Sequence, residues 1–93
     1  MINYRKLFVS QFLDQYHYVA VIYEEETNCF YEALFECVWG GGACGDYLKN
    51  KDRAISIDVV RKFARRSEDS RADKYVNISE DNWQELLRGY KIL

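Results

Sequence analysis

Residues 28–45 read NCFYEALFECVWGGGACG, and this stretch decides how the rest of the chain folds. It holds all three cysteines, four of the five glycines and one of the two tryptophans. A helical period over Cys29–Trp39 gathers on one face five apolar side chains: Phe30, Ala33, Leu34, Cys37 and Val38. We favour this helix, because Thr27 or Asn28 can cap its start and Gly40 can end it.

A strand is the alternative for the same residues. A period of two places on one face a different set: Tyr31, Ala33, Phe35, Cys37 and Trp39. Aromatic side chains are common in strands, so this pattern also fits. The strand would make Tyr16–Trp39 a hairpin that turns at Glu25–Asn28.

The composition predicts one folded domain over residues 1–93. The chain is 48% hydrophobic and 16% aromatic, which argues against disorder. It has no apolar run of about 18 residues and no signal-peptide pattern at its start, so we expect no membrane partner and a cytoplasmic location. Three cysteines is an odd number, which favours reduced thiols over a disulfide scaffold.

Local patterns outside this stretch predict an α+β fold, with an antiparallel sheet of about three to four strands and two to three helices. The clearest strand pattern is Tyr16–Tyr23, and Lys74–Ile78 is a second strand pattern. Leu7–Leu13 fits either a short strand or one helical turn. Ser56 or Asp58 caps a helix that runs to about Ser67, and Ser79 caps a last one. The glycine-rich segment Gly40–Asn50 is expected to be a loop.

The segment Asn28–Leu34, NCFYEAL, resembles the nucleophile helix of papain-like cysteine proteases, in particular the ovarian-tumour type. A helix N-terminus stabilises a thiolate, which is the nucleophilic form of cysteine. The resemblance implies that Cys29 is a nucleophile. His17, the only histidine, would be its base, although it precedes Cys29 in the chain.

Cofactor and metal motifs are weak in this chain, and we expect neither a cofactor nor a metal. Cys29, Cys37 and Cys44 with His17 lack the short cysteine spacing of a zinc knuckle. Gly40–Gly45 fits the glycine pattern of dinucleotide sites, but the polar residues after it are too few for the required helix.

The leading hypothesis is therefore a non-enzymatic domain that binds and occludes a protein partner, as immunity proteins, antitoxins and phage-encoded inhibitors do. The first 48 residues carry two basic residues against seven acidic ones, which favours a partner with a basic surface. The candidate contacts are acidic: Glu24, Glu25, Glu26, Glu32 and Glu36. The alternatives are the cysteine enzyme and a nucleic-acid-binding protein that uses one basic helix: Arg61, Lys62, Arg65 and Arg66.

Overall fold

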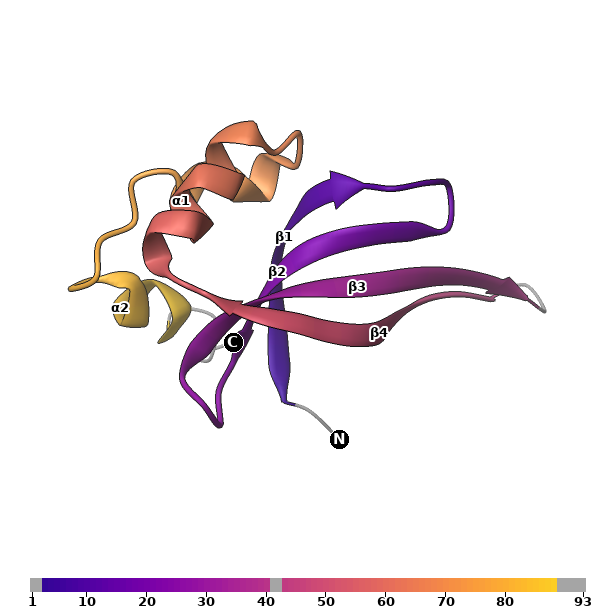
Figure 1. Ribbon diagram of the computed structural model, residues 1–93, viewed down its shortest axis with the longest axis horizontal. Coiled ribbons are helices and arrows are strands. Elements are labelled where there is room, and N and C mark those ends of the chain that lie inside the picture. The colour runs from indigo at the N-terminus through magenta and orange to yellow at the C-terminus, as the bar shows by residue number, and fades with distance from the viewer. Residues whose placement is uncertain (1–2, 41–42, 89–93) are drawn as a thin grey trace.

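Four antiparallel strands followed by three short helices form the computed structural model, which describes residues 3–40 and 43–88 (Figure 1). The strands lie side by side in chain order: β1 Tyr4–Phe12, β2 His17–Glu24, β3 Cys29–Gly40 and β4 Ala43–Ile55. The helices are α1 Ile57–Arg66, the 3-10 helix η1 Ser70–Tyr75 and α2 Trp83–Arg88. This architecture confirms the expected α+β class. Within the described residues, no helix is long and apolar enough to cross a membrane.

The stretch at Cys29–Trp39 is a strand, so the favoured helix is wrong and the hairpin alternative is confirmed. β2 and β3 pair from Glu24 opposite Cys29 to His17 opposite Glu36. The turn falls at residues 25–28, and Asn28 takes a left-handed conformation with φ 57°. Asparagine adopts this conformation more readily than most residues, which suits it to end the turn.

The helical pattern in β3 arises because both faces of the sheet are covered. Phe30 packs in one hydrophobic cluster, whereas Ala33 and Phe35 pack in another on the opposite face. Apolar residues on both faces break the simple alternation and produce spacings of three and four by coincidence. The interpretation of Cys29–Trp39 therefore depended on packing that the local sequence does not reveal.

Two other sequence predictions are also wrong. Gly40–Asn50 is not a loop, because β4 begins at Ala43 and pairs with β3 along its whole length; residues 41 and 42 lie outside the described part. Lys74–Ile78 is not a strand, since the 3-10 helix η1 ends at Tyr75. Tyr75 and Ile78 both pack in the same cluster, and a spacing of three residues suits a 3-10 turn better than a strand.

The three helices cover one face of the sheet, at the left end of Figure 1. Ser56 caps α1 as expected, since its hydroxyl accepts the backbone N–H of Val59 at 3.3 Å. The buried residues of this first core come from β1, β2, β3 and all three helices: Leu7, Phe8, Val21, Tyr23, Phe30, Ile57, Val60, Ala64, Ala72, Tyr75, Ile78 and Leu87.

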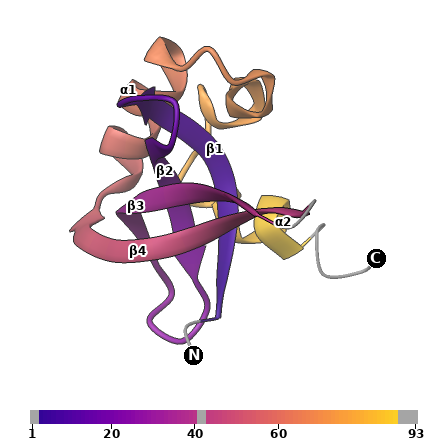
Figure 2. The same cartoon turned by 90° about the vertical axis from the view of Figure 1, so that its right-hand side faces the viewer.

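The opposite face of the sheet forms a second core without any helix over it. Tyr18 and Phe35 stack with their ring centroids 5.3 Å apart, and Phe35 is 1% exposed. In a flat sheet the first and fourth strands lie roughly 14 Å apart, at about 4.8 Å per strand. Here Lys6 on β1 and Asp46 on β4 form an ion pair of 3.0 Å across this face. The sheet therefore curls, as Figure 2 shows, and buries its own second face.

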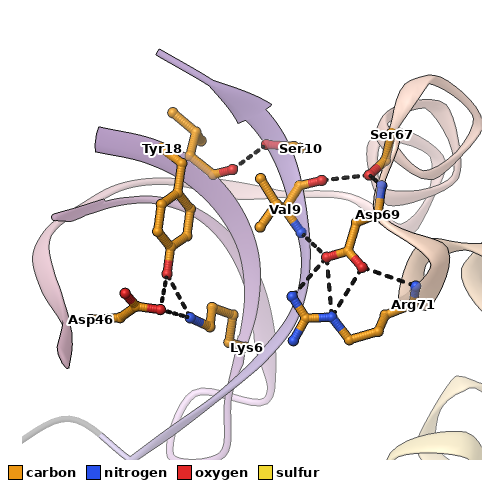
Figure 3. Close-up of polar contacts among 9 residues, drawn as sticks. Lys6, Val9, Ser10, Tyr18, Asp46, Ser67, Asp69 and Arg71 are labelled. Atoms are coloured by element: carbon orange, nitrogen blue, oxygen red, sulfur yellow. Dashed lines mark hydrogen bonds and ion pairs between the residues drawn. The ribbon is translucent and has the colours of Figure 1, made fainter. Parts of the chain in front are cut away.

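The outer edge of β1 is closed by the segment that follows α1 (Figure 3). The backbone N–H of Val9 donates to the Asp69 carboxylate at 2.8 Å, and the Val9 carbonyl accepts the Ser67 hydroxyl. These two side chains take the hydrogen bonds that a neighbouring strand would make. This contact fixes η1 against β1.

Candidate functional site

The structure does not bring Cys29 and His17 together. Cys29 begins β3 opposite Glu24, whereas His17 begins β2 opposite Glu36, seven residues along the ladder. At about 3.3 Å per residue, the two lie roughly 23 Å apart. Cys29 is also in a strand and not at a helix N-terminus. Both conditions for an activated Cys29 thiolate are therefore missing.

Cys37 is the described cysteine closest to His17 along the ladder, but it faces the other side of the sheet. Its thiol donates to the Asp46 carboxylate, in the cluster that also contains Lys6 and Tyr18. The His17 ring instead contacts Glu36. No thiol–imidazole pair forms within the described residues. The Cys44 side chain lies outside them, so the zinc combination is not described in full.

The five glutamates proposed as partner contacts do not form one patch. Glu24 is 4% exposed and bonds Lys51 at 2.7 Å across the curled face. Glu25 pairs with Arg5, and Glu32 pairs with Arg53 on β4. Most of these carboxylates therefore hold the sheet together through cross-strand ion pairs. Glu26 is exposed, and Glu36 lies in a different region, described below.

The basic helix keeps most of its side chains on the surface. Lys62, Arg65 and Arg66 are exposed. Arg61 is instead half-buried, since its Nε donates to the Ile78 carbonyl at 2.6 Å and its guanidinium pairs with Asp58. Arg61 thus links α1 to the segment before α2. The nucleic-acid alternative rests on the other three cations and stays a prediction.

A different surface gathers most of the exposed apolar side chains. Among the side chains that the structure describes, five large hydrophobic residues are exposed: Phe12, Leu13, Tyr16, Val38 and Tyr47. Leu13, Tyr16, Val38 and Tyr47 lie at the end of the sheet away from the helices, on the β1–β2 and β3–β4 hairpins, to the right in Figure 1. Phe12 instead lines a small cavity with Arg66 and Glu68, next to the end of α1. Pairing puts Tyr47 on the same face as His17, because His17, Glu36 and Tyr47 face one another across three strands, and Val38 shares that face with Glu36. We call Leu13, Tyr16, Val38, Tyr47, His17 and Glu36 the distal surface.

The distal surface contains a cavity of about 770 Å³. Its lining comes from the start of β2 and the end of β3: Gln15, Tyr16, His17, Glu36, Cys37 and Val38. The backbone N–H of Cys37 donates to the Tyr16 carbonyl at 2.7 Å, which holds the two sides of the cavity together. Tyr16 and Val38 are 48% and 41% exposed, so apolar surface borders the cavity.

A histidine between two carboxylates forms the polar centre of this surface. Asp14 accepts the backbone N–H groups of Tyr16 and His17 at 2.7 and 2.8 Å and contacts His17 Nδ1 at 3.0 Å. Glu36 contacts His17 Nε2 at 3.2 Å. The hydrogen bond to Asp14, with a smaller contribution from Glu36, raises the pKa of His17 above its usual value. The pKa of Asp14 is lowered, chiefly by the Tyr16 N–H.

The charged histidine ties the β1–β2 turn to β3. Only imidazolium has two N–H donors, so both carboxylate contacts are hydrogen bonds at the same time only when His17 is protonated. Lys49 on β4 lies 4.0 Å from Glu36 and adds a second cation. The centre of the distal surface is thus a network of alternating charges, with apolar side chains around it.

Sequence reasoning identified Glu36 and His17 but missed Val38 and Tyr47. Val38 was assigned to the apolar face of the favoured helix, and Tyr47 fell within the segment Gly40–Asn50, which was interpreted as a loop. Comparison of the chain with known protein families, curated proteins and solved structures finds no match. The function must therefore be argued from this geometry.

Proposed function

We propose that this chain is a protein-binding domain that uses the distal surface to cover a functional surface of its partner. Inhibitory proteins such as immunity proteins and antitoxins act in this way. The acidic contacts expected from the sequence are reduced to Glu36, with Asp14 beside it, because Glu24, Glu25 and Glu32 are paired within the sheet.

One observation carries the proposal: four of the five large hydrophobic residues described as exposed gather at one end of the molecule, and two of them, Tyr16 and Val38, line a cavity of about 770 Å³. Single exposed apolar residues are ordinary, whereas a contiguous group bordered by polar side chains is typical of a protein interface. Two of the five are tyrosines, which are common at the energetic centres of interfaces. The position of this surface, far from the helices, leaves it open to a partner.

The surface selects a partner with apolar side chains and a nearby cation. An apolar side chain of the partner would fill the space between Tyr16 and Val38. A basic group would lie against Asp14, whose side chain is 56% exposed beside the half-buried His17. Charges at the border of an interface affect the association rate more than the affinity, so the apolar contacts supply most of the binding energy.

Site-specific photo-cross-linking tests this proposal. A benzophenone side chain would replace Tyr47 on the distal surface, and a matched one would replace Lys62 on the exposed side of α1. Both positions are exposed, so neither replacement should unfold the domain. After illumination in the source cells, we expect one dominant protein adduct from position 47 and none from position 62.

The adduct must also depend on the apolar contacts. In the position-47 probe, Tyr16→Ser should reduce the yield at least fivefold, whereas Glu68→Gln on the exposed segment after α1 should leave it unchanged. An adduct of two copies of this 11.1 kDa chain would show that the surface serves self-association, which contradicts binding of a separate partner. Equal adducts from positions 47 and 62 would also contradict the proposal.

A further inference from the structure

A second cavity, apart from the distal surface, lies between β1 and η1. Its volume is about 320 Å³, and six residues line it: Arg5, Lys6, Leu7, Arg71, Lys74 and Tyr75. Four of these six are cations, and they come from two segments more than sixty residues apart in the chain. We propose that this cavity binds the phosphate group of a small phosphorylated molecule.

Arg71 is held in place before any ligand arrives (Figure 3). Its Nε and Nη2 donate to Asp69 at distances between 2.8 and 3.1 Å, and Asp69 is itself bonded to the Val9 N–H of β1. Arginine carries five N–H donors, so two are used through Nε and Nη2. Within the described residues, no acceptor is seen for the two N–H groups on Nη1. These donors remain for a ligand.

Arg5 and Lys6 are oriented by partners in a similar way. Arg5 Nε donates to Glu25 at 3.0 Å, which uses one of its donors. Lys6 Nζ contacts Tyr18 Oη at 2.6 Å and Asp46 at 3.0 Å, which leaves one of its three N–H groups. Fixed cations lose little side-chain entropy when an anion binds, and two guanidinium groups can each bind phosphate oxygens with two parallel hydrogen bonds.

Tyr75 lines the same cavity with a buried ring and a hydroxyl that is not itself buried. The residue is 1% exposed, and its ring packs on Phe8 with the centroids 5.5 Å apart. Burial raises the pKa of Tyr75 to about 12, so the hydroxyl is protonated at neutral pH and can donate. Among the residues that the structure describes, none hydrogen-bonds this hydroxyl. A hydroxyl beside fixed cations can donate one more hydrogen bond to an anion with several acceptor oxygens.

The lining favours a terminal phosphate over a carboxylate or a nucleic-acid backbone. A phosphate monoester carries nearly two negative charges and three terminal oxygens at neutral pH, which suits several donors in one cavity. A carboxylate offers two oxygens and one charge. Extended nucleic acid needs a row of cations along its backbone, whereas these four converge on one volume of about 320 Å³.

The test is a titration with inorganic phosphate at constant ionic strength, followed by two-dimensional NMR of the backbone amides. We expect saturable shifts at Leu7, Arg71 and Lys74. Arg5→Gln combined with Lys74→Gln should weaken binding at least tenfold, and Tyr75→Phe, which keeps the buried ring, should weaken it about threefold to tenfold. Lys62→Gln removes an exposed cation on α1 and should change nothing.

Three further binding experiments identify the source of the phosphate and distinguish this site from the distal surface. A 5′-mononucleotide should bind at least as tightly as inorganic phosphate if the phosphate belongs to a larger metabolite, and more weakly if free phosphate is the ligand. Single-stranded RNA without a terminal phosphate should not shift the cavity amides. Tyr47→Ser should leave phosphate binding unchanged, even if it abolishes the photo-adduct.

Several results would overturn the proposal. These are shifts that do not saturate, an equal response to chloride or sulfate, or an affinity that Lys62→Gln lowers as much as the Arg5 and Lys74 changes do. RNA binding at these amides without any response to phosphate would also overturn it. Circular dichroism of each variant shows whether it is folded, so a loss of binding can be assigned to the cavity.

Discussion

Replacing Asp69 with asparagine should weaken the fold by removing a negative charge that only the folded state stabilises. The side chain is 11% exposed and accepts hydrogen bonds from Arg71 and from the Val9 N–H. These contacts, that of Arg71 first, lower the pKa of Asp69 from 3.8 to about 2. At about 1.4 kcal/mol for each pKa unit, the difference corresponds to roughly 2 kcal/mol of folding free energy at neutral pH.

The pH dependence of this contribution has a definite sign. A carboxylate with a lowered folded-state pKa stabilises the protein above its unfolded pKa, and the contribution disappears as the pH falls through the folded value. The unfolded pKa of Asp69 is 3.8 and the folded pKa is about 2. Near pH 3, between these two values, the stabilisation by Asp69 should be about half of its value at neutral pH. The free-energy difference between wild type and Asp69→Asn should therefore shrink over the same range.

Urea unfolding, followed by circular dichroism at pH 7, 5, 4 and 3, measures this difference. Asp73→Asn is the matched control, because Asp73 is an exposed acid in η1 itself, and its effect should stay within about 0.5 kcal/mol. An Asp69→Asn effect no larger than that of the control would refute the anchoring role of Asp69. A large effect that does not change with pH would show that shape, and not charge, is responsible.

Three further predictions test the second core, the distal surface and the buried acid. Phe35→Ala should lower the free energy of unfolding by about 3–5 kcal/mol, as in a true core, and Phe35→Leu by less; a loss below about 1 kcal/mol would mean that the curled face is open to water. NMR titration should give His17 a pKa above 6.5, and Asp14→Asn should lower that pKa. The contribution of protonated His17 to stability is complete below pH 6.5 and is lost as the pH rises through the folded pKa. Glu24→Gln should reduce the melting temperature more than Glu26→Gln, because only Glu24 is buried against a lysine; equal losses would contradict that role.

Elements with strong local signals could be predicted from the sequence. Ser56 offers a cap, the next residues place apolar side chains at helical spacing, and α1 forms where expected. β2 is equally clear, because a run of β-branched and aromatic residues has no competing helical cap. In both cases the local preference and the packing in the fold agree.

The sequence was ambiguous where packing on both sides decided the structure. β3 has apolar residues on both faces because the helices cover one and the curl of the sheet covers the other. That curl brings Lys6 and Asp46, forty residues apart, into contact, so no local window of sequence reveals it. The surroundings of the proposed acidic contacts were hidden from the sequence for a related reason. Glu24 and Glu32 look like solvated acids in the sequence, but the partners that neutralise them are on β4, which was expected to begin as a loop.

The distal surface is notable because its apolar side chains lie outside both hydrophobic cores. This chain of 93 residues buries both faces of its sheet, one beneath the helices and one by curvature. Apolar side chains can therefore be buried in either of two cores. At the hairpin ends, beyond both cores, polar residues would serve folding as well as apolar ones, and they would protect better against aggregation. Tyr16, Val38 and Tyr47 nevertheless lie there, 48%, 41% and 56% exposed. Folding alone gives no reason for these residues, whereas the protein partner that we propose would cover them.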